Sequence, residues 1–208
     1  MNLESQFSGR WTIDPAHSRI GFSTRHAMVT KVRGAFNDIE GFADIDLEDL
    51  TRSTVEVKLR VESIDTRDKD RDTHLMSEDF FHAQRYPFII FQSSSIDEVD
   101  DGQFIVSGDL TIRDVTRPIT IPLELTGIDT DMFGTVRAGL EGNRRIDRKD
   151  WGVRWNSVLD SGGVMVSDKV TLEFELSLTQ TEETAEDTPQ DSIDQEAPTS
   201  QYRPWLRQ

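Results

Sequence analysis

The chain contains no cysteine among its 208 residues. Disulfides, thiol catalysis and thiolate metal sites are therefore excluded. The absence of cysteine fits a reducing compartment. The segment MNLESQFSGRW at the N-terminus has no apolar run and no cleavage-site pattern, so we expect no signal peptide.

Long apolar runs and clusters of basic residues are also missing. No stretch of 18 consecutive apolar residues occurs, so we expect no membrane-spanning helix. The formal net charge of -16 argues against nucleic acid as a partner, because phosphates require clustered Lys and Arg. The same charge argues against attachment to an anionic membrane surface.

Motifs for catalysis or metal binding are absent as well. The four histidines lie far apart, without HxH or HExxH spacing, and structural or surface roles are favoured for them. The run IDTRDKDRDTH lacks the glycine and the distal glutamate of a calcium loop, so it indicates ion pairs around a short helix. No GxSxG, GxGxxG or P-loop pattern occurs. We therefore predict no catalytic residue, no metal and no cofactor.

What the chain does contain, from about Trp11 to Leu178, is apolar residues that alternate with polar ones in short runs. This alternation is typical of strands with one apolar face. Eight strands are expected, at residues 11–22, 32–47, 53–64, 88–96, 103–112, 119–125, 133–144 and 169–178. The phase of the second strand shifts near Gly41, which predicts a bulge or turn there. Pro122, within the sixth strand, indicates a sheet edge or a local break in pairing.

Helix is scarce by comparison. The best candidate for a helix is TRDKDRDTHLMSEDFFHAQRYP, residues 66–87, in which Ser77 is expected to cap a short turn that runs to Gln84. A second short turn is expected at 24–30. Two helical pieces cannot cover the apolar faces of eight strands. The strands must therefore form a two-sheet sandwich or a closed barrel, and their even spacing favours a barrel. Such a barrel is filled with side chains or holds one small ligand.

Three regions are expected along the chain. Residues 1–9 form a flexible N-terminus, residues 10–178 the barrel, and residues 179–208 an acidic, largely disordered tail. The tail has too few apolar residues to offset the entropy cost of ordering. Its last residues, YRPWLRQ, are interpreted as an exposed end, with a short partner-binding motif as the alternative.

Aromatic residues of the predicted strands leave one question open. A filled core and an apolar tunnel both require inward-facing phenylalanines, so alternation does not separate them. Trp151 and Trp155, in RKDWGVRWN, are expected to form a plug at one end of the barrel.

Six motifs together resemble the YceI-like family of lipid-binding, lipocalin-like barrels, and they occur in the family's order over roughly residues 10–178. The motifs are WTIDPAHSRIGFSTRH, KVRGAFNDIEG, SIDTRDKDRDTHLMSEDFF, YPFIIFQSSSI, GDLTIRDVTRPITIPLELTG and IDRKDWGVRWN. Trp151 stands where the family often has Phe.

The resemblance implies an all-β, extended antiparallel eight-stranded barrel with one or two short helices and a long apolar channel. In characterised relatives this channel holds a polyisoprenoid, as in a quinone-like lipid, or a comparable acyl chain. Carriage, storage or sequestration of such a lipid is the function implied, and no catalysis is established for the family as a whole. Many relatives are exported with a signal peptide. This chain shows none, which indicates the cytoplasm.

Strand phase, combined with the resemblance, predicts a ligand-binding set. Its members are Phe22, Val32, Phe36, Phe42, Phe88, Ile90, Phe104, Leu110, Ile121 and Phe174. His17, Arg25 and His26 are candidates for contact with the head group. A pyrophosphate head would also require converging arginines such as Arg33, Arg144 or Arg145. The net charge of -16 favours a neutral head instead.

Two alternatives remain open. An enzyme acting on an isoprenoid lipid would require an acid–base set inside the channel, for example His17 or His26 near Asp14. A filled barrel would instead serve as a protein-interaction module through a partner of the acidic tail. Exposed strand edges would also allow a homodimer.

Overall fold

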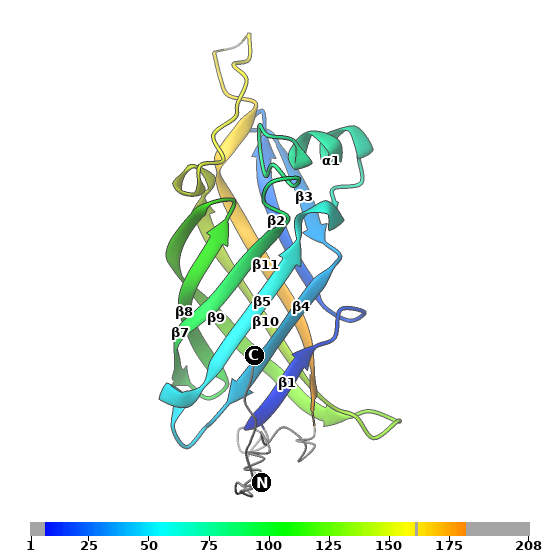
Figure 1. Ribbon diagram of the computed structural model, residues 1–208, viewed down its shortest axis with the longest axis vertical. Helices are drawn as coiled ribbons and strands as arrows, with labels where there is room; N and C mark the ends of the chain where they lie inside the picture. Colours follow the sequence, from blue (N-terminus) through cyan, green and yellow to red (C-terminus); the bar gives the residue numbers. More distant parts are fainter. Residues whose placement is uncertain (1–6, 161, 182–208) are drawn as a thin grey trace, which may run out of the picture.

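Strands dominate the computed structural model, which describes residues 7–160 and 162–181 (Figure 1). One α-helix, α1 (Lys69–Met76), and the 3-10 turns η2 (Leu50–Arg52), η3 (Val61–Ser63) and η4 (Arg148–Trp151) accompany them in this part of the chain. The strands are β1 (Gly9–Ile13), β2 (Arg19–His26), β3 (Thr30–Phe36), β4 (Ile39–Ile45), β5 (Thr54–Arg60), β6 (Ile64–Asp65), β7 (Phe88–Asp100), β8 (Gln103–Ile112), β9 (Val115–Thr130), β10 (Val136–Asp147) and β11 (Val166–Gln180).

Eight of these strands close into a ring. The order is β1-β4-β5-β7-β8-β9-β10-β11, and β1 pairs with β11, all antiparallel. The remaining strands β2, β3 and β6 extend the wall beyond β1 and β4, because β11 pairs with β1 near Leu178 and with β2 near Leu172. The predicted all-β, eight-stranded antiparallel barrel with a short helix is confirmed.

Two of the predicted strands are each divided in two. The strand expected at 11–22 breaks after Ile13, since the Asp14 carboxylate accepts a hydrogen bond from the Ala16 N–H (3.0 Å) and forms a turn. The strand expected at 32–47 breaks at Asn37 and Asp38, whose N–H groups both donate to Ser63 Oγ. The bulge predicted at Gly41 is therefore wrong, because the change of phase comes from this break.

The helix lies within the predicted segment 66–87 but before Ser77, and that serine is followed by turns at 78–81 and 83–85. Asp68 is the N-cap of α1, and its carboxylate accepts from the Arg71 N–H (3.1 Å). Ser77 is the C-cap, where its hydroxyl donates to the His74 carbonyl (2.7 Å). The helix therefore begins at the aspartate upstream and ends at the serine. Only a turn at 27–29 occupies the second predicted helical segment.

Pro122 lies inside β9 and marks a local break in pairing. Pairing of β9 with β10 runs from Thr130 to Leu123 and ends there, while pairing with β8 continues through Pro122. Proline has no N–H to donate to a second neighbouring strand. Beyond this point β9 and β10 separate.

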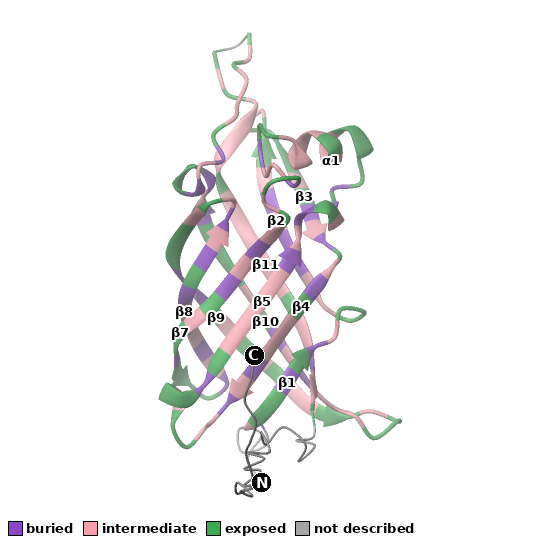
Figure 2. Ribbon diagram, viewed as in Figure 1, coloured by how far each residue is buried: buried purple, intermediate pink, exposed green. Residues whose placement is uncertain are grey.

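Buried residues recur along the inward faces of the strands (Figure 2), as in β8. The barrel extends slightly beyond its predicted bounds. Phe7, from the predicted N-terminal segment, is buried, and β11 continues to Gln180, two residues into the predicted tail. The rest of both predicted segments, 1–6 and 182–208, lies outside the described residues. No helix in the described ranges has the length and apolar character to cross a membrane.

Candidate functional site

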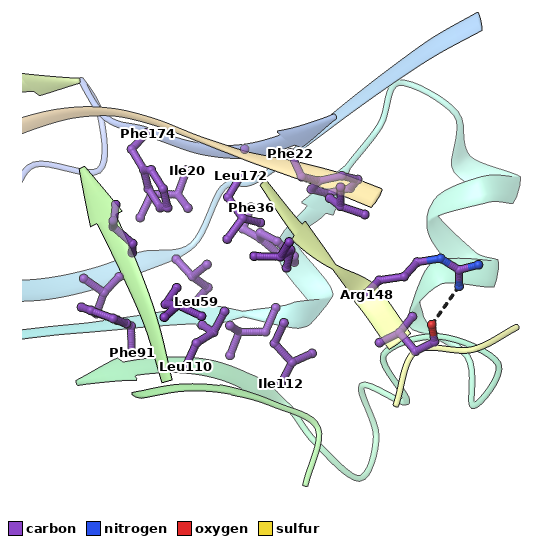
Figure 3. Close-up of a pocket in the computed structure, with 18 of the residues that line it drawn as sticks. Ile20, Phe22, Phe36, Leu59, Phe91, Leu110, Ile112, Arg148, Leu172 and Phe174 are labelled. Carbon is purple, nitrogen blue, oxygen red and sulfur yellow. Dashed lines mark hydrogen bonds between the residues drawn. The ribbon is translucent and has the colours of Figure 1, made fainter. Parts of the chain in front are cut away.

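The barrel encloses an apolar cavity of about 200 Å³ (Figure 3). Among the described residues that line it, only Thr24 and Arg148 have polar side chains. The lining residues are Ile20, Gly21, Phe22, Thr24, Phe36, Val55, Val57, Leu59, Leu75, Phe80, Phe81, Ile89, Phe91, Val106, Leu110, Ile112, Ile119, Ile121, Leu123, Ile146, Arg148, Val153, Val166, Val170, Leu172, Phe174 and Leu176.

Strand alternation produces this lining. In β11, Leu172 and Phe174 face the cavity, whereas Glu173 between them faces outward. Glu173 there accepts hydrogen bonds from Ser23 Oγ (2.7 Å) and Arg19 Nη1 (3.2 Å), which lower the pKa of its carboxyl against the effect of its burial. This strand thus has an apolar inner face and a polar outer face.

One end of the barrel is closed by aromatic packing. Trp11 is fully buried, and its Nε1 donates to the Phe7 carbonyl (2.9 Å). The Phe7 ring lies 5.3 Å from the Trp11 ring and 5.7 Å from the Phe104 ring, centroid to centroid. This closure is not predictable from the sequence, because a tryptophan in a strand pattern does not reveal which rings surround it.

The other end of the barrel carries α1, η4 and the loops after them. Trp151 is buried, and Trp155 packs against His74 and Phe80, with ring centroids 4.6 Å and 5.2 Å away. Phe80 itself lines the cavity. The two tryptophans therefore cover this end, where a plug was expected.

Arg148 is the one charged residue among those described that line the cavity. Its guanidinium is 6% exposed and donates to the backbone carbonyls of Ser167 (3.1 Å), Val153 (2.9 Å) and Trp155 (2.9 Å). Asp168 Oδ1 lies 3.5 Å from Nη2. Burial lowers the pKa of Arg148. The side chain fastens the loop that follows η4, a role that no local motif in the sequence indicates.

Five of the ten predicted ligand-binding residues line the cavity: Phe22, Phe36, Leu110, Ile121 and Phe174. Phe104 is buried at the closed end, beside Phe7. Val32 pairs with Thr24 on β2 but is not part of the lining.

The other three predicted residues, Phe42, Phe88 and Ile90, lie on the outer face. The Arg10 guanidinium sits 4.7 Å above the Phe42 ring, and Lys58 Nζ sits 4.0 Å above the Phe88 ring. In FIIF, residues 88–91, both faces of β7 are apolar, so the sequence does not indicate which of two neighbouring residues points inward. Ile89 and Phe91 line the cavity in place of their neighbours.

None of the predicted head-group residues lines the cavity. The side chain of His17 is 66% exposed on the outside, with Nδ1 2.7 Å from Asp14 Oδ2. Arg25 and His26 are exposed at the end of β2, where Arg25 Nη1 donates to the Val29 carbonyl (3.1 Å). Arg144 and Arg145 are exposed on β10.

The acid–base pair considered for an enzyme does form, but outside the cavity. Asp14 also accepts from Arg137 Nη1 (2.6 Å), and this bond is the main cause that lowers the pKa of Asp14 to about 2. Within the described part of the chain, no group of three His, Cys, Asp or Glu is arranged to hold a metal.

Comparison with known proteins gives a consistent result. The family model of the YceI-like domain matches residues 11–178. A UPF0312 protein of Shewanella denitrificans is 32% identical over 160 residues, which cover 77% of this chain and 82% of that protein.

Solved structures share the fold. A YceI protein of Campylobacter jejuni has a TM-score of 0.65 and 26% identity, covering 76% of this chain and 90% of that one. A polyisoprenoid binding domain from Saccharophagus degradans has a TM-score of 0.64 and 14% identity, covering 82% and 98%. The latter likeness supports the fold alone.

Proposed function

Because this chain belongs to the YceI-like family, we propose that its barrel binds a long apolar lipid, a polyisoprenoid or an isoprenoid quinone. Binding serves carriage, storage or sequestration of that lipid. A polyisoprenoid binding domain has the same fold, so the fold is able to accommodate a lipid of this class. The observation that carries the proposal is the cavity, whose described lining is apolar except at Thr24 and Arg148.

The lining selects for hydrocarbon. Each buried methylene gains about 0.8 kcal/mol, so an isoprenoid chain binds tightly without polar contacts. A polar ligand in the same place loses its hydrogen bonds to water and finds almost none in exchange. Specificity then comes from the length and shape of the channel.

The size of the cavity implies movement on binding. Its volume of about 200 Å³ is below the roughly 300–1,000 Å³ of sites for drug-sized ligands. The rings of Phe22, Phe36 and Phe81 are in contact across it, with centroids 5.9 Å apart in each adjacent pair. We infer that these rings turn aside when a chain enters, which lengthens the channel.

The head group lies outside this lining. The Arg148 guanidinium donates hydrogen bonds to the carbonyls of Ser167, Val153 and Trp155, so it offers no strong site for a pyrophosphate. A neutral quinone head, left at the end covered by α1 and η4, fits this arrangement. Absence of a converging acid–base set among the described lining residues favours binding over catalysis.

The test is organic extraction of the full chain purified from its own host, followed by mass spectrometry. The expected result is one polyprenyl lipid per protein, or uptake of an added isoprenoid quinone by protein that emerges empty. Protein that is repeatedly empty and takes up no quinone would contradict the proposal.

A further inference from the structure

The turn between β2 and β3 presents apolar side chains to solvent. Met28 is 56% exposed and Val29 is 78% exposed. Ala27 and Met28 have φ of +49° and +58°, a left-handed conformation that is costly for residues with side chains. Asn-Gly is the sequence commonly found in hairpin turns whose residues have positive φ. Here the chain keeps apolar side chains at an exposed and strained position.

A second apolar tip stands beside the first. Val158 and Val164 form an isolated antiparallel bridge, and both are exposed. The Ala27 N–H donates to the Met165 carbonyl (2.7 Å), which holds the two turns together. We refer to Met28, Val29, Val158 and Val164 as the apolar tips.

The strands that lead into the first tip carry a charge opposite to that of the whole chain. Residues 19–36 contain no Asp or Glu, although the chain has a net charge of -16, and they include four basic residues: Arg19, Arg25, Lys31 and Arg33. Glu173 pairs with Arg19 and Lys31, whereas in the described residues no carboxylate forms an ion pair with Arg25 or Arg33. The second tip has one exposed acid, Asp160. The first tip therefore emerges from a basic surface.

The apolar tips lie at the end of the barrel away from its aromatic closure (Figure 1). Thr24 and Val166 line the cavity, and each is within a few residues of a tip. Any surface that contacts the tips is therefore next to the wall of the cavity.

We propose that the apolar tips dock the barrel on a lipid bilayer that contains anionic phospholipids. Protruding aliphatic side chains suit insertion among head groups, and Arg25 and Arg33 attract the phosphates. Four side chains bury far less than the roughly 800 Å² per partner of a stable protein interface, which disfavours a second copy of the chain. The net charge, which argues against an anionic surface, is concentrated elsewhere on the chain.

The docking of the barrel goes beyond the proposed function and does not require a ligand in the cavity. It would bring the cavity wall to the place where apolar lipids are dissolved. Protein that emerges empty, takes up no added quinone and still binds vesicles supports docking and contradicts the carrier function. Loaded protein that does not bind vesicles supports the carrier function and contradicts docking.

The experiment is flotation of the full chain with vesicles, at low salt. Vesicles of phosphatidylcholine alone are compared with vesicles that also contain phosphatidylglycerol. The full chain is expected to bind the second kind. The tip variant, with Met28→Ser, Val29→Ser, Val158→Ser and Val164→Ser together, is expected to bind about tenfold more weakly. The double variant Arg25→Gln/Arg33→Gln is expected to bind these vesicles more weakly, and its binding should change less when salt is added.

The matched control is Met132→Ser with Phe133→Ser. These side chains are even more exposed, but they lie in the turn between β9 and β10, with acidic Asp129 and Asp131 before them. Binding by this control should equal that of the full chain, and thermal unfolding of every variant should be cooperative.

Three results would overturn the proposal. The full chain binds neither kind of vesicle, or the control loses binding while the tip variant keeps it. The third result is a full chain that sediments as a dimer and a tip variant that sediments as a monomer. That result would make the tips a surface for self-association.

Discussion

Trp151 Nε1 donates a hydrogen bond to the backbone carbonyl of Leu110 at 2.8 Å. This bond ties η4 to β8, which is separated from β10 by β9 in the sheet. Leu110 lines the cavity, so the bond also connects the cavity wall to η4, which covers this end of the barrel.

Replacing Trp151 by Phe should remove this bond while keeping an aromatic ring in place. The buried carbonyl of Leu110 then loses a donor, and we expect the free energy of unfolding to fall by about 1–3 kcal/mol. Urea denaturation measures the change. Trp155→Phe is the control, since no hydrogen bond of its indole occurs in the described structure. Equal effects of the two substitutions would contradict the role assigned to the bond.

A bulky residue inside the barrel should block the ligand. Leu172→Trp adds a ring to the cavity, whereas Ile90→Trp adds the same ring on the outer face of β7. We expect Leu172→Trp to reduce the lipid extracted per protein and Ile90→Trp to leave it unchanged, because only the first competes for channel volume. A normal amount of lipid in Leu172→Trp would show that the ligand lies elsewhere.

Gly108 should tolerate no side chain. A Cβ at this position would lie 2.3 Å from the Gln92 carbonyl oxygen on the neighbouring strand, so β7 and β8 would have to separate. We expect Gly108→Ala to lower the free energy of unfolding by about 2 kcal/mol. Gly127→Ala, where nothing lies within 4 Å of the added carbon, should be neutral or slightly stabilising. Thermal melts of both variants test this contrast.

Asp14 should make the stability of the barrel depend on acid pH. Its pKa is lowered from 3.8 to about 2, chiefly by Arg137, so the folded state resists protonation more than the unfolded state. The stabilisation is complete above about pH 5 and is lost as pH falls towards 2. The Asp14 side chain is 15% exposed, and we expect about 1–2 kcal/mol.

Urea denaturation of the parent chain and Asp14→Asn over this pH range isolates the contribution of Asp14. The difference in unfolding free energy between the two proteins should shrink as the pH decreases. A difference that stays constant with pH would contradict the assignment.

Arg148 and Lys149 offer a matched test of buried and exposed charge, since both contact Asp168. Arg148→Met leaves the carbonyls of Ser167, Val153 and Trp155 without their donor, and we expect a loss of about 3 kcal/mol in unfolding free energy. Lys149→Met removes only a surface ion pair, and its effect should stay within about 0.5 kcal/mol. Calorimetry of both variants distinguishes the two cases.

Several features followed from the sequence because they depend on local pattern. Alternation along β8 and β11 shows strands with one apolar face, and too few helical residues remain to cover them. Strand count and helix scarcity favoured a closed barrel, and the family resemblance implied eight strands in it. The ring does have eight strands, but two of the predicted strands each divide and the short β6 is added, so the described residues form eleven strands. Phe22, Phe36 and Phe174 were placed correctly because their strands have one apolar face and so an unambiguous phase.

Tertiary structure decided whatever depends on residues far apart in the chain. The phase of β7, with FIIF apolar on both faces, is settled by Lys58 and Arg60, which lie over Phe88 from a neighbouring strand. The closed end needs Phe7, Trp11 and Phe104 together, and a cavity rather than a filled core depends on how all the inward side chains pack. A periodic pattern determines which face of a strand is apolar, whereas only packing between strands determines what that face contacts.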